Sequence, residues 1–267
     1  MNCLIIGAQK AGTTALARFL SEHPDVCVAP AKEAHLFDSP AFEDTRAYCD
    51  ACYAEAFPNF SGQRIVLEAT PIYMYLPIAL GRIARYNPAM RLIAVLRNPS
   101  ERAVSHYTME RRRGREPLSF AAAIAAEPFR LWYGRGDLAW GSVPRAKSYV
   151  HRGFYSRQIQ EILRVFPRDQ LLLLRMDDLR HDYEATMDAV YRFLSVPRPA
   201  TLPAPREIRP NVALSAGAPP PDDAAGDIRL ASWVPSLLAA VYRREITRLE
   251  RLMETDLSGW RTPIRSR

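Results

Sequence analysis

A glycine-containing loop near the start of the chain could bind an anion. It runs from Gly7 to Thr14 (GAQKAGTT), between an apolar run and a helical pattern. Backbone N–H groups at a helix N-terminus, with the positive end of the helix dipole, favour a bound anion. Gly7 and Gly12 allow tight turns, and Lys10 and Thr13 add side-chain donors. The segment predicts a cradle for one phosphate-like group, with a ligand-free glycine turn as the alternative.

The same loop differs from the nucleotide-binding Walker loop, which reads G-x-x-x-x-G-K-[ST]. Thr13 stands where the Walker lysine would be, and the lysine of this loop, Lys10, comes three residues earlier. Without the Lys-Ser/Thr pair, the loop is poorly suited to hold a β,γ-phosphate with Mg²⁺. A P-loop kinase or NTPase is therefore disfavoured and kept as the first alternative function.

A second candidate anion site follows a later apolar run. The stretch LRNPSERAVS at 96–105 opens a helical pattern, so Arg97 is expected at the carboxyl end of a strand. Ligands bind at that edge in open α/β sheets. The guanidinium of Arg97 offers a planar, charged fork for a phosphate, and the Ser105 hydroxyl, about two turns into the helix, can complete the contact. A surface arginine beside a helix cap is the alternative.

The elements that must position these residues alternate between strands and helices. Strands are predicted at 3–6, 64–69, 91–96 and 171–174, and helices at 15–20, 75–86, 100–113, 154–166 and 183–194. Nearly continuous apolar strands separated by helices are typical of a parallel sheet covered on both faces. We therefore expect a single α/β domain over residues 1–267, with a central parallel β-sheet flanked by helices.

Two further segments lack these periodicities. Residues 131–147, which contain Trp132 and Trp140, are predicted to form a long loop, and loops of that length are commonly functional. The proline-rich segment at about 197–225 cannot form a regular helix or a central strand. It leads to an amphipathic C-terminal helix at about 236–256.

Composition limits the function classes. The chain has 267 residues, of which 48% are hydrophobic and 24% charged, an ordinary globular mixture. Its 36 Lys and Arg residues against 29 Asp and Glu residues leave a net charge of +7. That excess suits anionic ligands but not a nucleic-acid arm, so no nucleic-acid partner is expected. A non-catalytic anion-binding module is the second alternative.

The sequence also carries expectations about location. Its apolar runs are too short to span a membrane, and the opening MNCLIIGA lacks the regions of a secretory signal. Its four cysteines fit a reducing interior. Cys49 and Cys52 have CxxC spacing, which we interpret as coincidence rather than a zinc or redox site, since no second pair follows. We expect a cytoplasmic protein.

Together, the motifs resemble those of the sulfotransferases that use 3′-phosphoadenosine 5′-phosphosulfate (PAPS), in particular the heparan-sulfate-type glycan enzymes and their bacterial relatives. The matching stretches are GAQKAGTTAL at 7–16 with HPDV at 23–26, KEAHLFD at 32–38, EATPIY at 68–73, LRNPSERAVSHY at 96–107, RGFYSRQIQEILRVFPRDQLLLL at 152–174 and RLERLMETDLSGW at 248–260. The first and fourth of the main motifs are specific together; the others would be weak alone.

The resemblance implies a P-loop-kinase-like sulfotransferase fold and two sites for the donor. The loop at 7–14 would hold the 5′-phosphosulfate, and Arg97 with Ser105 the 3′-phosphate. Arg206 and Arg209, after the last strand, are further candidates for the 3′-phosphate or the adenine edge. The candidate donor-binding residues are Gln9, Lys10, Ala11, Gly12, Thr13, Thr14, Arg97, Ser105 and Arg209. No metal is expected.

The implied reaction transfers the sulfuryl group to a hydroxyl or amine of a carbohydrate or other small-molecule acceptor, in line with departure of the 5′-phosphate. Lys10 is the candidate cation for charge that develops on the bridging oxygen. The acceptor must lose a proton to a base. Glu33 matches the family's glutamate base, and His35 is the second candidate. On an extended segment both side chains would share a face. A solvated Lys32–Glu33 pair is the alternative.

Candidate acceptor contacts are Glu33, His35, Tyr73, Trp132 and Trp140. Aromatic rings can stack on a flat acceptor or cap a core. One position departs from the family pattern: several heparan-type enzymes carry a catalytic lysine where this chain has Ala69, so here its charge is absent or supplied by another residue. The identity of the acceptor, O- versus N-sulfation and the oligomeric state are left open by the sequence.

Overall fold

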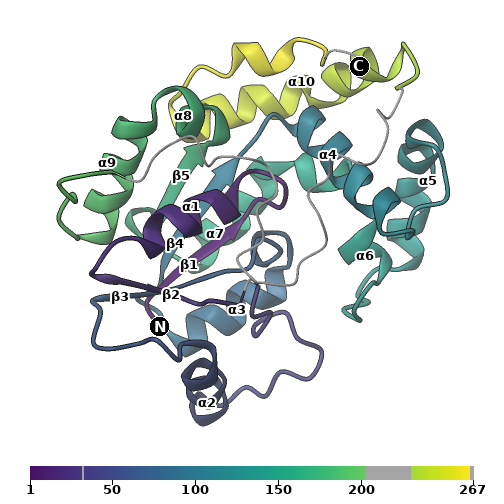
Figure 1. Cartoon of the computed structure of the whole chain (residues 1–267). Coiled ribbons are helices and arrows are strands. Elements are labelled where there is room, and N and C mark those ends of the chain that lie inside the picture. The colour runs from purple at the N-terminus through teal and green to yellow at the C-terminus, as the bar shows by residue number, and fades with distance from the viewer. Residues whose placement is uncertain (32, 203–229, 265–267) are drawn as a thin grey trace. The chain divides into compact units, whose positions relative to one another are not determined.

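The computed structural model describes residues 1–31, 33–202 and 230–264. They divide into two compact units, and Figure 1 labels the helices and strands. Among the described residues, the first unit comprises 1–31, 33–96 and 161–202, and the second comprises 97–160 and 230–264. A single functional domain over 1–267 stays a prediction.

The first unit holds a five-stranded sheet in the order β2-β3-β1-β4-β5. Its strands are β1 (Cys3–Gly7), β2 (Val26–Val28), β3 (Ile65–Ala69), β4 (Arg91–Leu96) and β5 (Leu171–Arg175). Every neighbouring pair is parallel, which confirms the predicted parallel sheet. The four predicted strands are present within one residue at each end. The short β2 was not predicted, because three residues are too few to establish a periodicity.

The helices of the first unit connect these strands. They are α1 (Thr13–Ser21), α2 (Arg46–Ala56), α3 (Pro77–Tyr86), α8 (Met176–His181) and α9 (Tyr183–Leu194), with the 3-10 turns η1 (Tyr73–Tyr75) and η3 (Arg168–Gln170). The helix α7 (Tyr155–Val165) begins in the second unit and ends in the first. The predicted helices at 15–20, 75–86, 154–166 and 183–194 correspond to α1, α3, α7 and α9.

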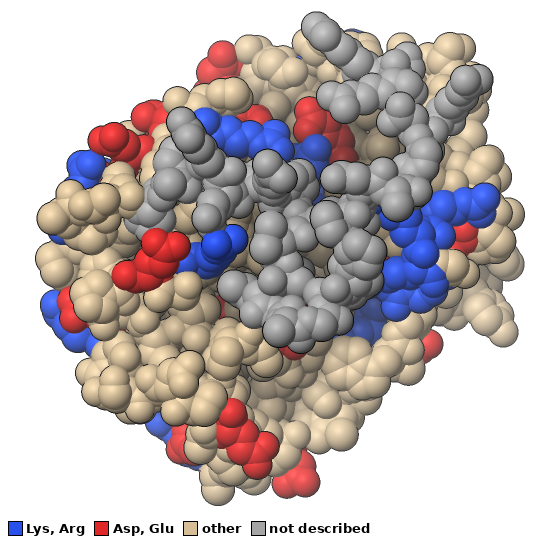
Figure 2. All heavy atoms as spheres, in the orientation of Figure 1, with Lys and Arg blue, Asp and Glu red and all other residues tan. Residues whose placement is uncertain are grey.

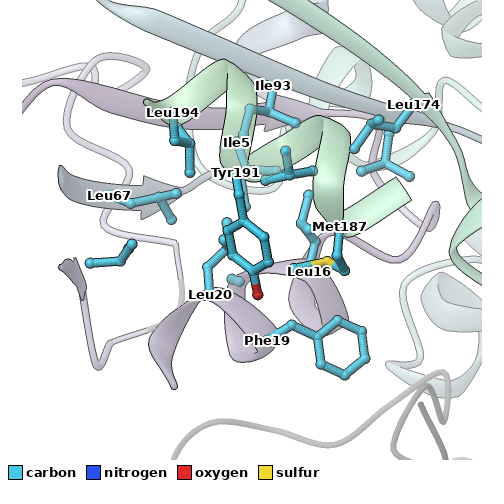
Figure 3. Close-up of a cluster of buried hydrophobic side chains, with 14 of the residues drawn as sticks. Ile5, Leu16, Phe19, Leu20, Leu67, Ile93, Leu174, Met187, Tyr191 and Leu194 are labelled. Carbon is cyan, nitrogen blue, oxygen red and sulfur yellow. The ribbon is translucent and has the colours of Figure 1, made fainter. Parts of the chain in front are cut away.

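Both faces of the sheet are buried. On one face, Ile5 packs with Leu16 of α1 and Met187 of α9 in the cluster that Figure 3 shows. Successive strand residues point to opposite faces, so Leu4 and Leu92 point to the other face, where they are 0% exposed as well. Strands buried on both sides explain the nearly continuous apolar runs of the sequence.

The second unit is helical. It contains α4 (Pro99–Arg112), α5 (Phe120–Tyr133), α6 (Val143–Ala146), α10 (Val234–Met253) and the turns η2 (His151–Gly153) and η6 (Ser258–Arg261). The helices α4 and α10 pack together, and the Tyr242 hydroxyl on α10 donates to the Val150 carbonyl at 2.7 Å.

Two boundaries in this unit differ from expectation. The long loop predicted at 131–147 is wrong at both ends: α5 continues to Tyr133, with its C-cap at Gly134, and 143–146 form α6. The predicted C-terminal helix at 236–256 is α10. It begins two residues earlier, with proline in its first turn, and ends before Glu254, whose left-handed φ of 51° stops the helix.

Part of the proline-rich segment can be described. Residues 197–202 contain no helix or strand, and the rest of the predicted loop, with Arg206 and Arg209, lies outside the described residues. Within the described ranges, no helix combines the length and apolar character needed to cross a bilayer. Figure 2 shows basic and acidic side chains interspersed on the face it draws.

Candidate active site

The loop between β1 and α1 has the backbone geometry of an anion cradle. Lys10 and Gly12 have left-handed φ values of 71° and 90°, and alternating left-handed residues turn successive N–H groups toward one side. Gly12 is the N-cap of α1, and no side chain in the described structure caps that end. A Cβ on Gly12 would meet Met176 at an ordinary 3.6 Å, so φ rather than space requires glycine here.

The first residues of α1 line a small hollow. Thr13 is 4% exposed. The hollow is lined by Thr13, Thr14, Ala17, Val28, Ala29, Ala31, Glu33 and Ala69. The structure therefore brings the candidate base Glu33 to the hydroxyl-bearing end of the anion loop. Ala69, at the position where several heparan-type enzymes carry a lysine, lines the same hollow.

Glu33, His35 and Asp38 form a chain of charged contacts. The His35 Nε2 lies 3.3 Å from Glu33 Oε2, and its Nδ1 lies 3.0 Å from Asp38 Oδ2. The expectation of an extended segment is wrong, because Glu33 and His35 have left-handed φ values of 61° and 55°. The two side chains lie together, as their predicted shared face implies, but through left-handed backbone conformations rather than through strand alternation.

The contacts of His35 determine its protonation. Burial lowers the pKa of His35, but the hydrogen bonds to Asp38 and Glu33 outweigh it and raise that pKa to about 9. The imidazole therefore carries its proton at neutral pH. A protonated imidazole donates through both ring nitrogens, so it can hold Glu33 and Asp38 at once.

Glu68 on β3 is a buried carboxylate that sequence reasoning did not assign to the site. It is 0% exposed. It accepts hydrogen bonds from Thr70, from Tyr53 at 3.2 Å and from Tyr73 at 3.3 Å. Burial raises the pKa of Glu68 to about 7, against these hydrogen bonds, which lower it. A glutamate inside the apolar run RIVLEA was the signal that could have identified it.

Tyr73 does not fit its predicted role as an acceptor contact. Its side chain is 0% exposed. Its hydroxyl donates to Glu68 and accepts the Phe37 N–H at 3.3 Å. This residue is thus part of the buried frame that supports the 33–38 segment.

The second candidate anion site lies at the start of α4. Arg97 directly follows β4, and its side chain, 19% exposed, contacts Glu101 at 2.8 Å. Glu101 and Ser105 are four residues apart on α4, so they share one face of the helix. Arg97 therefore contacts a residue of the helix face that also carries Ser105, and the joint role of Arg97 and Ser105 at a 3′-phosphate stays a prediction. Asn98 caps α4 by accepting the Ser100 N–H at 3.0 Å.

The two predicted aromatic contacts lie in the second unit. Trp132 is 62% and Trp140 58% exposed, so both rings are accessible, and Arg145 stacks 4.3 Å from the Trp140 ring centroid. Cys49 and Cys52 are free thiols on α2. Within the described ranges, no group of three His, Cys, Asp or Glu side chains has the geometry of a metal site.

Comparison with known proteins connects this geometry to a chemistry. The family model described as "Sulfotransferase domain" matches residues 2–212. The chain is 34% identical over 200 residues to the human protein "Heparan sulfate glucosamine 3-O-sulfotransferase 6", covering 75% of this chain and 54% of that protein. It is 30% identical over 204 residues to the human "Bifunctional heparan sulfate N-deacetylase/N-sulfotransferase 2", covering 72% of this chain and 22% of that protein. The chain therefore spans about half the length of the first of these relatives and less of the second.

A solved structure gives the same result over the full length. A sulfotransferase from Alicyclobacillus acidocaldarius is 28% identical and superposes with a TM-score of 0.76, covering 97% of this chain and 98% of that one. The superposition supports the α/β sulfotransferase fold predicted from the sequence.

Proposed function

Because the chain belongs to the sulfotransferase family, we propose that it transfers a sulfuryl group from PAPS to a hydroxyl or amine of a carbohydrate or other small molecule. One observation carries the proposal: Glu33 lines the same hollow as Thr13 and Thr14. Such a transfer needs a proton acceptor close to groups that bind the leaving phosphate, and Glu33 lines one hollow with the two threonines that follow the loop glycine.

The loop residues suit a phosphosulfate. Left-handed Lys10 and Gly12 and the uncapped start of α1 offer N–H groups, and Thr13 and Thr14 offer hydroxyls. When bound, PAPS supplies the sulfuryl group and a leaving 5′-phosphate. We assign the binding of the 5′-phosphosulfate of PAPS to the loop residues Gln9, Lys10, Ala11, Gly12, Thr13 and Thr14. We assign the 3′-phosphate to Arg97 and Ser105. Arg209, outside the described residues, is a further candidate.

Lys10 is assigned the role of stabilising negative charge. As the S–O bond breaks, its electron pair stays on the bridging oxygen of the 5′-phosphate. An ammonium group aimed at that oxygen stabilises the transition state more than the ground state.

Glu33 is assigned the role of base. Its carboxylate takes the acceptor's proton while the acceptor oxygen or nitrogen forms its new bond to sulfur. His35 already holds its proton, because its pKa is raised to about 9, so it is poorly suited to accept another. It holds the carboxylate of Glu33 in place instead.

The acceptor class follows from the relatives by analogy. Their names describe O- and N-sulfation of heparan sulfate, so we propose a glycan acceptor, with exposed Trp132 and Trp140 as candidate sugar contacts.

The kinase and NTPase alternative has less support, since Thr13 replaces the Walker lysine. A function limited to anion binding does not explain why the carboxylate of Glu33 lies beside the anion-binding loop. A cytoplasmic location stays a prediction.

The test combines binding with turnover. Thermal melts with adenosine 3′,5′-bisphosphate, with ATP plus Mg²⁺ and with AMP compare the ligands, since a ligand of the native state raises the midpoint. We expect the bisphosphate to give the largest rise. Incubation with ³⁵S-labelled PAPS and de-sulfated heparan oligosaccharides should label the glycan. A larger rise with ATP plus Mg²⁺, or labelling that is absent across hydroxyl and amine acceptors, would contradict the proposal.

A further inference from the structure

Glu68 is a buried titratable group for which the proposed reaction has no use. It lies on β3, where its neighbours across the sheet are apolar, and its carboxylate is 0% exposed. Ionised carboxylates are costly to bury unless hydrogen bonds compensate them. Its donors are the hydroxyls of Thr70, Tyr53 and Tyr73.

Thr70 and Tyr73 do more than satisfy this carboxylate. The Thr70 hydroxyl accepts the backbone N–H of His35 at 3.4 Å, and the Tyr73 hydroxyl accepts the backbone N–H of Phe37 at 3.3 Å. A hydroxyl that donates its proton to a carboxylate turns its lone pairs toward other donors. Glu68 thereby orients both hydroxyls as acceptors for the 33–38 backbone.

That backbone needs external support. Glu33 and His35 both have left-handed φ values, 61° and 55°, which non-glycine residues adopt sparingly. Such conformations persist where the surrounding structure over-determines them. The anchors on His35 and Phe37 lie directly in and after this strained turn.

We propose that Glu68 is a positioning residue that, through the hydroxyls of Thr70 and Tyr73, holds the 33–38 turn in the conformation that presents Glu33. We call these hydrogen bonds, from Glu68 through Thr70 and Tyr73 to the 33–38 backbone, the clamp. Its catalytic consequence rests on the proposed function, but the clamp itself is a property of the folded chain. The EATPIY stretch at 68–73 would then serve to hold the segment that carries Glu33.

The charged surroundings of Glu68 come from three elements. Tyr53 faces it from α2, Tyr73 from η1 and His35 from the 33–38 turn. Asp38, on the same turn, acts on Tyr73. Burial raises the pKa of Glu68 to about 7, so the ability of its carboxylate to accept the hydrogen bonds of Thr70 and Tyr73 changes near neutral pH. Protonated Glu68 would itself donate, and one hydroxyl would have to turn its own proton elsewhere.

Amide hydrogen exchange of the ligand-free protein tests the clamp without any turnover. In Glu68→Gln, we expect the His35 and Phe37 amides to exchange about 10-fold faster or more than in the wild type. Thr70→Val should accelerate exchange at His35, and Tyr73→Phe at Phe37. Tyr53→Phe is the matched control: it loses a hydroxyl bonded to Glu68, but within the described residues no hydrogen bond joins Tyr53 to the 33–38 backbone.

Turnover provides the second readout. In Glu68→Gln, we expect kcat to fall by about 100-fold, the size of a small misplacement of a reacting group, with KM for PAPS and the bisphosphate melting shift unchanged. Because the groups act as one unit, Glu68→Gln and Thr70→Val together should cost less than the product of their separate effects.

The outcomes are separable. Unchanged exchange at His35 and Phe37 in Glu68→Gln, or equal effects in Tyr53→Phe, would overturn the clamp whatever the activity. Lack of turnover by the wild type would contradict the proposed function and leave the exchange result standing. If Glu68→Gln does not fold, Thr70→Val and Tyr73→Phe decide the matter, and normal exchange in both would overturn it.

Discussion

The two candidate anion sites are made from different parts of the chain. In the first unit, the β1–α1 loop offers backbone N–H groups set by the left-handed φ of Lys10 and Gly12. In the second unit, the start of α4 offers a side chain, Arg97, paired with Glu101. Main-chain N–H groups can bind any phosphate-like group. The guanidinium of Arg97, by contrast, adds affinity only for a ligand that carries a second phosphate. Affinity for the common 5′ end and selectivity for the 3′-phosphate should therefore be separable by mutation.

The largest effect is expected at the carboxylate beside the first site. Glu33→Gln should lower kcat by about 100- to 10,000-fold, because an amide cannot take the acceptor's proton. The bisphosphate melting shift should be unchanged. Steady-state kinetics with PAPS and a glycan acceptor measure the rate, and Glu55→Gln, an exposed position on α2, is the control. Turnover retained in Glu33→Gln would move the base elsewhere.

Arg97→Ala should weaken adenosine 3′,5′-bisphosphate binding by about 10- to 100-fold, since hydrogen bonds to charged groups contribute about 1.5–3 kcal/mol. AMP, which lacks the 3′-phosphate, should bind as before. Isothermal titration with both ligands measures this selectivity. Glu101→Gln is the companion variant: it removes the carboxylate that competes for Arg97, so it should leave bisphosphate affinity equal or higher. Equal losses for both ligands in Arg97→Ala would erase the distinction between the two sites.

Gly12→Ala should weaken the bisphosphate and AMP alike, by about 10-fold, because a side chain at φ 90° strains the backbone by about 1–2 kcal/mol. Gly62→Ala is the matched control: it also has a left-handed φ, of 98°, and open space around it. It should cost similar stability without changing ligand affinity. A Gly12→Ala protein that loses only the bisphosphate would contradict a backbone-built 5′ site.

The smallest expected effect is on stability against pH. The folded-state pKa of His35, about 9, lies above the ordinary 6.5. Its contribution to stability is therefore complete below pH 6.5 and is lost as pH rises through 9. Denaturant titrations of wild type and His35→Gln should differ by an amount that shrinks, on the order of 1 kcal/mol, across that window. A constant difference would show that the Glu33–His35–Asp38 contacts do not control the charge of His35.

Local patterns account for much of the fold and for the first site. Runs such as RLIAVL at 91–96 are buried on both faces, so composition alone identified the strand. The glycine loop was identifiable because its backbone conformation requires glycine at position 12. The four-residue α6 and the three-residue β2 were missed, since short elements carry too little periodicity. The helix α5 was also not predicted, although it has 14 residues.

The arrangement around Glu33 was only partly predictable. Sequence spacing indicated that Glu33 and His35 would meet, but an extended backbone was expected, and the turn is left-handed. Tyr73 was expected to face the acceptor and is instead buried against Glu68. Both corrections have one cause: the hydroxyls of Thr70, which directly follows β3, and of Tyr73 on η1 accept backbone N–H groups of the turn from more than thirty residues along the chain.

The sequence by itself determined that this chain builds a parallel sheet, places a glycine loop at the first strand–helix junction and belongs among the sulfotransferases. These features depend on neighbouring residues, whose apolar period and backbone freedom are readable along the chain. The tertiary structure decided which carboxylate is buried, which histidine keeps its proton and how the 33–38 turn is held. Those properties depend on burial and on donors that come from distant segments, and no local pattern records either.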